Sequence, residues 1–269
     1  MTVHSGPGVR PAAAAGTFYP ADPARLAATV DALLAAAGPA PAPTPGGRLP
    51  ALVVPHAGYR YCGPVAAAAF ALVGDRSPRR VVVLGPAHFV PLTGSAVPHA
   101  DEWSTPLGRV PVDRPARDLA LALAGVRAAD EPHAGEHAVE VQLPFVQRAV
   151  GPGPAVLPVA TAAPPAEVAI LLDAIAADPG TLVIASTDLS HFLPDAAARD
   201  RDRDTIEAVL ALRPDLLGPS SACGAHALRG LLVWARRTGR TPALLAYRTS
   251  ADAGGDPHRV VGYAAFALG

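Results

Sequence analysis

The sequence contains no lysine, because all 22 of its basic residues are arginines. Without a lysine amine, a lysine Schiff base and the lysine of a phosphate-binding loop are both excluded. The basic residues are balanced by 23 acidic residues. No net field therefore attracts nucleic acid or an anionic membrane, and we expect neither as a partner.

Cysteines and long apolar runs are also scarce. Two cysteines, Cys62 and Cys223, are too few for a disulfide framework. The longest apolar run without glycine or proline covers residues 65–73, far short of the roughly 18–20 residues that span a bilayer. The first residues lack a basic start followed by an apolar stretch of signal-peptide length. We therefore expect a cytoplasmic protein with no membrane span.

Several familiar catalytic motifs are absent. The sequence has no G-x-S-x-G, H-E-x-x-H, Walker loop or C-x-x-C, and no G-x-G-x-x-G follows a strand pattern. The hydrolases, zinc proteases, nucleotide-binding folds and redox proteins that carry these motifs are correspondingly disfavoured. The function must therefore depend on residues that lie far apart in the sequence.

Short β-rich apolar runs alternate with alanine- and leucine-rich helical patterns along the chain. This alternation predicts an α/β fold, a single three-layer domain with a mostly parallel central sheet. We expect a flexible tail over residues 1–15, one domain over residues 16–269, and a surface loop over Pro39–Pro50. The predicted strands are Ala51–Val54, Val81–Leu84, Ala155–Val159, Leu182–Ala185, Ala243–Tyr247 and Val260–Phe266. The predicted helices are Pro23–Ala37, Pro64–Val73, Pro115–Ala124, His137–Ala149, Pro165–Ala177, Ala196–Leu212 and Cys223–Thr238.

Polar residues follow three of the predicted strands. His56 and His88 come shortly after the first two strands, and Asp188 and His191 follow Leu182–Ala185. In open α/β sheets, ligands bind outside the carboxyl ends of the strands. The sequence therefore predicts that these four side chains lie at one edge of the sheet.

Cys223 lies at the N-terminus of a predicted helix. Backbone N–H groups at a helix N-terminus stabilise a thiolate, so Cys223 is a candidate soft metal ligand or nucleophile. A buried, inert thiol is the alternative interpretation for Cys223. Cys62 has no such neighbours, and we interpret it as structural.

The segment from His133 to Gln142 concentrates histidines and glutamates at the start of a predicted helix. Glu136 and Glu140 are four residues apart and would share a helix face, whereas His137 would be rotated by roughly 100° from Glu136. We expect His137 and one of the two glutamates to line a pocket. Both glutamates are candidates, and so is Tyr59, which follows His56. The segment 101–108 is a candidate pocket wall.

Six motifs occur in order along the chain: PHAGYRYCGPVAAAAF, VVVLGPAHFVPLTGSAV, DEWSTPLGRVPVD, EHAVEVQLPFVQ, STDLSHF and SACGAHAL. Together they resemble the Memo (mediator of cell motility) family, whose bacterial and archaeal members are often called AmmeMemoRadiSam system protein B. The resemblance runs from about Gly16 to the C-terminus. Memo proteins are similar in fold to LigB-type class III extradiol dioxygenases, which use non-haem Fe(II).

This resemblance implies a metal centre. His56, His88 and Cys223 match the family's metal-binding positions, and His191 matches the catalytic acid/base histidine of the dioxygenases. Those enzymes complete their ligand triad with a glutamate, so Cys223 is a departure that this chain shares with Memo. We therefore expect one divalent metal, and the similarity to Fe(II) dioxygenases favours Fe(II). Cu and Zn are alternatives, because a thiolate is softer than a carboxylate. The catalytic candidates are His191, His137 and Asp188, which would orient His191 or another residue that supports the metal ligands.

The first functional hypothesis is a metal-dependent oxidoreductase that acts on a small phenolic or related substrate. The alternative is a non-catalytic module that handles metal or binds a (phospho)peptide, in which Arg60 and Arg109 would meet a phosphate or carboxylate. Zinc-dependent hydrolysis is a third possibility. The resemblance also suggests a radical-SAM protein and an AMMECR-domain protein as pathway partners.

Overall fold

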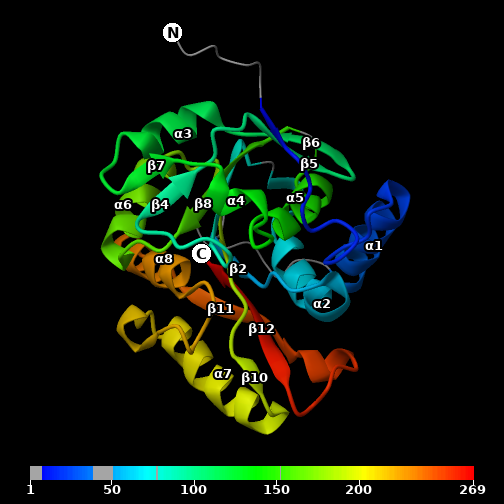
Figure 1. Ribbon diagram of the computed structural model, residues 1–269. Coiled ribbons are helices and arrows are strands. Elements are labelled where there is room, and N and C mark those ends of the chain that lie inside the picture. The colour runs from blue at the N-terminus through cyan, green and yellow to red at the C-terminus, as the bar shows by residue number, and fades with distance from the viewer. Residues whose placement is uncertain (1–7, 39–50, 77, 152) are drawn as a thin grey trace.

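Four parallel strands form the centre of the main sheet in the computed structural model (Figure 1). The structure describes residues 8–38, 51–76, 78–151 and 153–269, so the predicted loop over residues 39–50 lies outside the described residues. The four strands are adjacent in the order β2 (Ala51–Val54), β9 (Thr181–Ser186), β3 (Arg80–Gly85) and β8 (Ala155–Thr161).

Antiparallel strands extend this centre on both sides, so the sheet is mixed at its flanks. Next to β2 lies the antiparallel β12 (Val260–Leu268), which also pairs with β10 (His191–Leu193) and β11 (Pro242–Thr249). On the other side, β4 (Ser95–Val97) runs antiparallel to β8 and pairs in parallel with β7 (Val126–Ala128).

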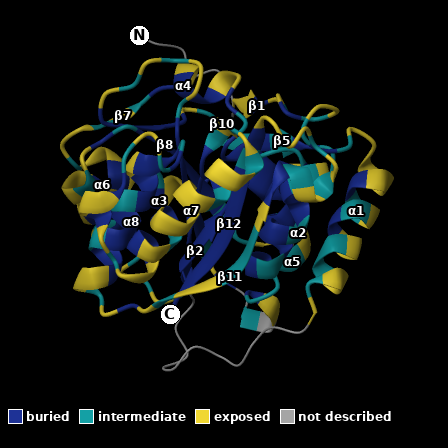
Figure 2. Cartoon of the chain, turned by 90° about the horizontal axis from the view of Figure 1, so that it is seen from below, coloured by how far each residue is buried: buried dark blue, intermediate teal, exposed yellow. Residues whose placement is uncertain are grey.

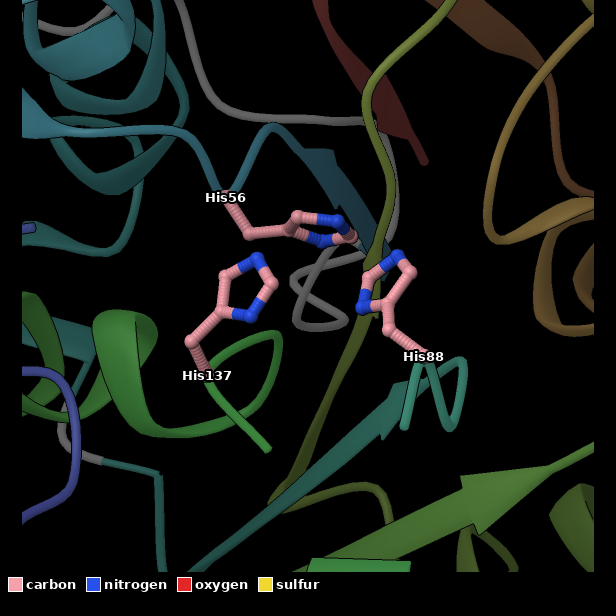
Figure 3. Close-up of side chains that lie close together, drawn as sticks. All are labelled: His56, His88 and His137. Carbon is pink, nitrogen blue, oxygen red and sulfur yellow. The ribbon is translucent and has the colours of Figure 1, made fainter. Parts of the chain in front are cut away.

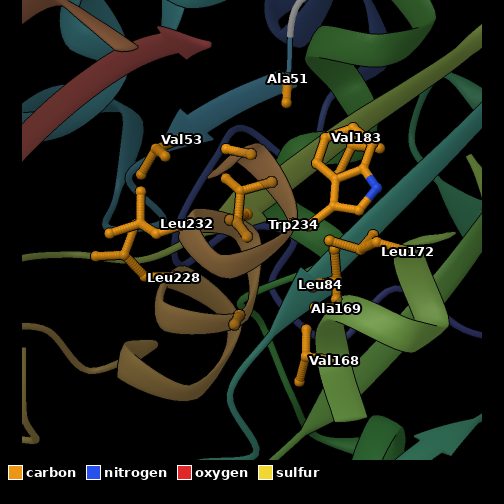
Figure 4. Packing of buried hydrophobic residues seen from close by; sticks show 14 of the residues in the cluster. Ala51, Val53, Leu84, Val168, Ala169, Leu172, Val183, Leu228, Leu232 and Trp234 are labelled. Atoms are coloured by element: carbon orange, nitrogen blue, oxygen red, sulfur yellow. The ribbon is translucent and has the colours of Figure 1, made fainter. Parts of the chain in front are cut away.

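Helices cover both faces of the sheet because both faces are apolar. Side chains alternate along a strand, so Leu52 and Val54 enter one core cluster while Ala51 and Val53 enter the other. In Figure 2 the strands at the centre are buried (dark blue), and the helices around them have exposed (yellow) outer parts. Figure 4 shows Trp234 among other buried side chains of the second cluster, such as Val183 and Leu172. The first layer contains α1 (Pro23–Ala36), α2 (Tyr59–Phe70) and α5 (Leu143–Ala149), and the second contains α3 (Arg114–Leu121), α6 (Pro165–Ile175), α7 (Asp195–Leu210) and α8 (Ala225–Arg237).

The predicted three-layer α/β fold is therefore confirmed, and all six predicted strands are present. Sequence patterns missed the shortest elements, which are too brief to show a period. The missed elements include β4, β7, β10, α4 (Glu131–Ala134), and the 3₁₀ turns Gly74–Arg76, Glu140–Gln142, Pro214–Leu216 and Ser250–Ala253.

None of the helices in the described ranges is both long and apolar enough to cross a membrane.

Two predicted helix starts are wrong. Helix α2 begins at Tyr59 and holds Pro64 inside it, where the sequence predicts a start at Pro64. The predicted helix over His137–Ala149 begins only at Leu143, after a turn and a 3₁₀ segment. Pro144 cannot donate a backbone hydrogen bond and is favoured in the first turn of a helix, so the chain begins a new helix there.

A small second sheet includes residues that the sequence assigns to the flexible tail. Strand β1 (Val9–Arg10) pairs in parallel with β5 (Glu102–Thr105), which forms a hairpin with β6 (Gly108–Pro111). Arg10 is buried and forms an ion pair with Glu140, and Ala14 is buried as well. The predicted tail boundary at residue 15 is therefore wrong for residues 9–15, because these residues contribute to the folded core.

Candidate metal centre

Three histidines converge at the carboxyl edge of the parallel strands (Figure 3). His56 lies two residues after β2, His88 lies three residues after β3, and His137 comes from the turn before α5. One ring nitrogen from each histidine lies within 4.8 Å of those of the other two. His56 and His137 are mostly or fully buried, and the His88 side chain is 28% exposed. The group is therefore compact and open to solvent on the side of His88.

Cys223 lies against this group through His56. Its Sγ atom is 3.2 Å from His56 Nε2 and accepts a hydrogen bond from the backbone N–H of Asp188 at 3.3 Å. Burial raises the pKa of the Cys223 thiol to about 12, and the Asp188 carboxylate adds to this effect. Within the described part of the chain, the compact ligand group comprises the three histidines without Cys223. Coordination by Cys223 stays a prediction, while His137 takes a place among the ligand candidates.

Glu136 supports His88. Its carboxylate accepts hydrogen bonds from His88 Nδ1 at 2.9 Å, from the His88 backbone N–H at 2.5 Å and from the Ala138 N–H at 2.8 Å. Burial raises the pKa of Glu136, but these hydrogen bonds outweigh it and lower the pKa to about 2. A carboxylate that accepts from Nδ1 leaves Nε2 of His88 free for a metal ion, the usual support of a histidine ligand.

His137 Nδ1 also lies near this carboxylate, at 3.3 Å from Glu136 Oε1. The two atoms are within ion-pair distance but not aligned as a hydrogen bond, so Nδ1 is a buried nitrogen without a hydrogen-bond partner in the described residues. The Phe18 ring stacks on His137, with ring centroids 4.2 Å apart. The imidazole is thus held by packing against the Phe18 ring.

The buried imidazoles are neutral at pH 7. Burial lowers the pKa of His56 to about 3, with a smaller contribution from His88. Burial likewise lowers the pKa of His137 to about 4, with His56 contributing. A neutral imidazole has the lone pair that a metal ligand needs, and burying it as a cation would be costly. The donor set therefore fits a divalent metal ion, with three imidazoles that leave further coordination positions open.

His191 begins β10, three residues after Asp188 on the segment that follows β9. Its Nδ1–H donates to the Leu189 carbonyl at 2.8 Å, so in the neutral ring Nε2 has the lone pair. Among the described residues, no hydrogen-bond partner is found for this Nε2. The Asp188 carboxylate accepts a hydrogen bond from the His56 backbone N–H at 2.8 Å. Asp188 therefore holds the backbone of a ligand candidate, which is one of the two roles predicted for it. The Leu189 carbonyl binds the His191 ring.

Two predicted pocket residues lie elsewhere. The Tyr59 hydroxyl donates to the Val141 carbonyl at 2.6 Å within the core. Glu140 is fully buried and accepts hydrogen bonds from Arg10, Ala13, Ala14 and Tyr19. The prediction that Glu136 and Glu140 share a helix face fails because this segment is a turn followed by a 3₁₀ helix.

The remaining residues named from the sequence have described contacts with groups other than the three histidines. Arg109 pairs with Glu102 at 2.8 Å on the exposed β5–β6 hairpin. The Arg60 guanidinium stacks over the Tyr61 ring, and Cys62 is a buried thiol that donates to the Ala57 carbonyl. Trp103, from the predicted pocket wall, packs under Arg10 and against His133.

Sequence reasoning missed several residues around the histidines. Phe18 and Phe89 lie against the His137 ring, and Ser186 binds His56. Gln142 does not contact a histidine itself but binds Ser186. Ser186 is the last residue of β9, so its place at the edge of the sheet was a usable signal. Nothing in the local pattern marks Phe18 or Gln142, because their contacts bridge distant parts of the chain.

The fold and the site define an α/β protein with a three-histidine group at the carboxyl edge of its sheet. A family model described as Memo-like protein matches residues 10–267. The chain therefore belongs to the Memo-like family. It is 38% identical to a MEMO1 family protein of Methanopyrus kandleri, covering 95% of this chain and 97% of that one. It is 34% identical to a MEMO1 family protein of Sulfolobus acidocaldarius, covering 97% and 99%.

A solved structure supports the fold. The crystal structure of an uncharacterized protein from Escherichia coli K12 matches with a TM-score of 0.54 and 18% sequence identity. The match covers 82% of this chain and all of that chain. At this level of identity the likeness concerns the arrangement of helices and strands.

Proposed function

We propose that the protein is a metal-dependent oxidoreductase that binds one Fe(II) ion and acts on a small phenolic or related substrate. The observation that carries the proposal is the group of three imidazoles within 4.8 Å, next to a fourth histidine whose Nε2 is free. His56, His88 and His137 would hold the ion, with Cys223 beside His56 as a further ligand. Bound non-haem iron supplies one-electron and O₂ chemistry that no side chain of the protein can provide.

The protein's own contribution begins with holding the ligands. Glu136 fixes His88 at both its ring and its backbone, and Asp188 fixes the backbone of His56. Such outer contacts orient imidazoles and raise their basicity toward a metal ion. The carboxylate charge of Glu136 also offsets part of the charge of a divalent ion. Imidazole ligands suit iron, copper and zinc, so the sulfur of Cys223 and the available metal decide between them.

His191 is the group that moves a proton. Its Nε2 lone pair can accept the proton of a phenolic hydroxyl, while its Nδ1–H stays on the Leu189 carbonyl at 2.8 Å. Proton transfer of this kind is typical of histidine near neutral pH. The Phe89 side chain is 66% exposed and its ring lies 6.0 Å from that of His137. It offers an apolar face against which a flat substrate can pack.

Zinc-dependent hydrolysis is the second candidate, and the three-histidine group itself favours it. Three imidazoles with an open position are a ligand set of catalytic zinc, which lowers the pKa of a bound water. His191 would then serve as the proton acceptor for the reacting water. The two candidates differ in the metal they need and in their use of O₂.

The test is metal content and turnover of protein that is made and kept without oxygen. We expect about one Fe per chain, and O₂ consumption when a catechol is added. In the variant His56→Ala, more than half of the metal and the O₂ consumption should be lost. His99→Ala is the matched control, because His99 is exposed and its ring is 3.5 Å from Asp130, away from the site.

Three outcomes would redirect the proposal. Zinc as the bound metal with ester or amide hydrolysis would support the second candidate. Peptide binding that survives complete removal of metal would support a non-catalytic binding module. Metal content that is unchanged in His56→Ala would refute the metal centre itself.

A further inference from the structure

The Ser186 hydroxyl lies at the meeting point of three polar groups behind the His56 ring. Ser186 is completely buried at the end of the central strand β9. Its Oγ atom is 2.6 Å from the Ala138 carbonyl oxygen, 2.9 Å from Gln142 Nε2 and 3.0 Å from His56 Nδ1. All three contacts are within normal hydrogen-bond distance, so each requires an assigned donor and acceptor.

The single proton of the hydroxyl decides these assignments. A carbonyl oxygen can only accept, so the Ser186 O–H must donate to Ala138. The two lone pairs of Oγ then remain, and both can only accept. Gln142 Nε2 donates to one of them, and His56 Nδ1 must donate to the other. His56 is therefore protonated at Nδ1, and its Nε2 has the lone pair.

Gln142 is fixed in the orientation that this assignment needs. Its Nε2 also donates to the Pro55 carbonyl at 2.9 Å, and a carbonyl cannot accept from the amide oxygen. The amide oxygen, Oε1, is buried without a hydrogen-bond partner in the part of the chain that the structure describes. The amide therefore cannot reverse without placing its oxygen against the Pro55 carbonyl, so Gln142 is a permanent donor to Ser186.

We propose that Ser186 and Gln142 are positioning residues that set the tautomer of His56 and so keep its Nε2 available as a metal ligand. The inference rests on the proposed metal centre and deepens it. Nε2 is the nitrogen that faces Cys223 Sγ at 3.2 Å. The opposite tautomer would place a proton where the ion must bind, and the ring would have to be turned or deprotonated before coordination.

The direct test uses the ring nitrogens of His56 in the metal-free protein. Nitrogen-15 NMR distinguishes a protonated ring nitrogen from one with a lone pair, so it reads the tautomer without any activity assay. In the unaltered protein we expect His56 to be protonated at Nδ1. A ring protonated at Nε2 would overturn the proposal, and this measurement does not depend on whether any variant folds.

The variant Ser186→Ala removes the acceptor from His56 Nδ1. We expect its His56 ring to populate both tautomers and its affinity for Zn(II), used as the probe ion, to fall by about 10–100-fold. Ser190→Ala is the matched control. Ser190 is also a buried serine after β9, but it binds Asp202 rather than His56. In Ser190→Ala, the His56 ring should stay protonated at Nδ1 and the Zn(II) affinity should equal that of the unaltered protein.

The outcomes separate this inference from the proposed function. If Ser186→Ala keeps both the Nδ1-protonated ring and the Zn(II) affinity of the unaltered protein, the positioning role is refuted. If the unaltered protein binds no metal but His56 is protonated at Nδ1 and loses this preference in Ser186→Ala, the proposed function fails. The tautomer control by Ser186 then still holds.

Discussion

Glu136 and Glu140 lie four residues apart in one short segment, and each is the centre of a different region. Glu136 binds His88 and approaches His137 at the edge of the sheet. Glu140 binds Arg10 and Tyr19 in the core beneath the N-terminal segment. The Glu136 carboxylate binds an imidazole that can hold an ion, whereas the Glu140 carboxylate accepts hydrogen bonds from groups that cannot.

The difference shows how the surroundings of a buried carboxylate decide its role. Glu140 is fully buried, and its oxygens are taken by a guanidinium, two backbone N–H groups and a hydroxyl. Nothing remains for a ligand, so this region stabilises the fold. Glu136 binds His88 and lies 3.3 Å from His137, and both belong to the three-histidine group. Its region is therefore arranged for an ion as well as for the fold.

The largest effect expected is on folding, from Glu140→Ala. Removing one partner of a buried ion pair leaves the Arg10 charge uncompensated, which typically costs about 3–5 kcal/mol. We expect the free energy of unfolding, measured with urea, to fall by that amount. Glu102→Ala, which removes the partner of the exposed Arg109, should change it by less than about 1 kcal/mol. Equal effects from the two variants would contradict the structural role of Glu140.

The second prediction concerns metal affinity in Glu136→Gln. The amide keeps the size of the side chain but removes the charge and weakens the hydrogen bond from His88 Nδ1. We expect Zn(II) affinity, measured by competition with a chelator, to fall by about 10–100-fold. The free energy of unfolding should change less than in Glu140→Ala. If affinity is retained, then Glu136 is a structural residue like Glu140 and the contrast between the two regions fails.

The smallest effect is expected from Phe18→Leu, which tests the link between the two regions. Phe18 follows the segment held by Glu140, and its ring stacks on His137 with centroids 4.2 Å apart. An aromatic pair contributes about 0.5–1.5 kcal/mol beyond its burial. We expect Zn(II) affinity to fall by a few-fold while the protein stays folded. A change as large as that in Glu136→Gln would mean that Phe18 does more than support the ring.

Much of the fold could be predicted because its signals are local. Each central strand is a continuous apolar run, and Asp22 followed by Pro23 marks the start of α1, where the Asp22 side chain accepts from the Arg25 N–H. The strand-end histidines His56 and His88 were also predictable, since the carboxyl ends of parallel strands meet at one edge. The short strands escaped prediction because two or three residues show no period.

The candidate site was predictable only in part. The sequence predicted that His137 and a glutamate would line the pocket, but its helical geometry for that segment was wrong. The helix begins only at Leu143, before Pro144. In the irregular segment before it, Glu136 lies beside His137, whereas Glu140 pairs with Arg10. The tautomer network of Ser186 and Gln142 joins strand β9 to a 3₁₀ segment far away in sequence.

By itself, the sequence determined which residue types were available and where most strands and helices lie along the chain, because apolar periodicity and helix caps act between near neighbours. The tertiary structure alone decided which polar groups face one another. The direction of a buried hydrogen bond depends on donors and acceptors brought together from distant segments. For that reason Glu140 became part of the core, and Glu136, Ser186 and Gln142 became the support of the histidines.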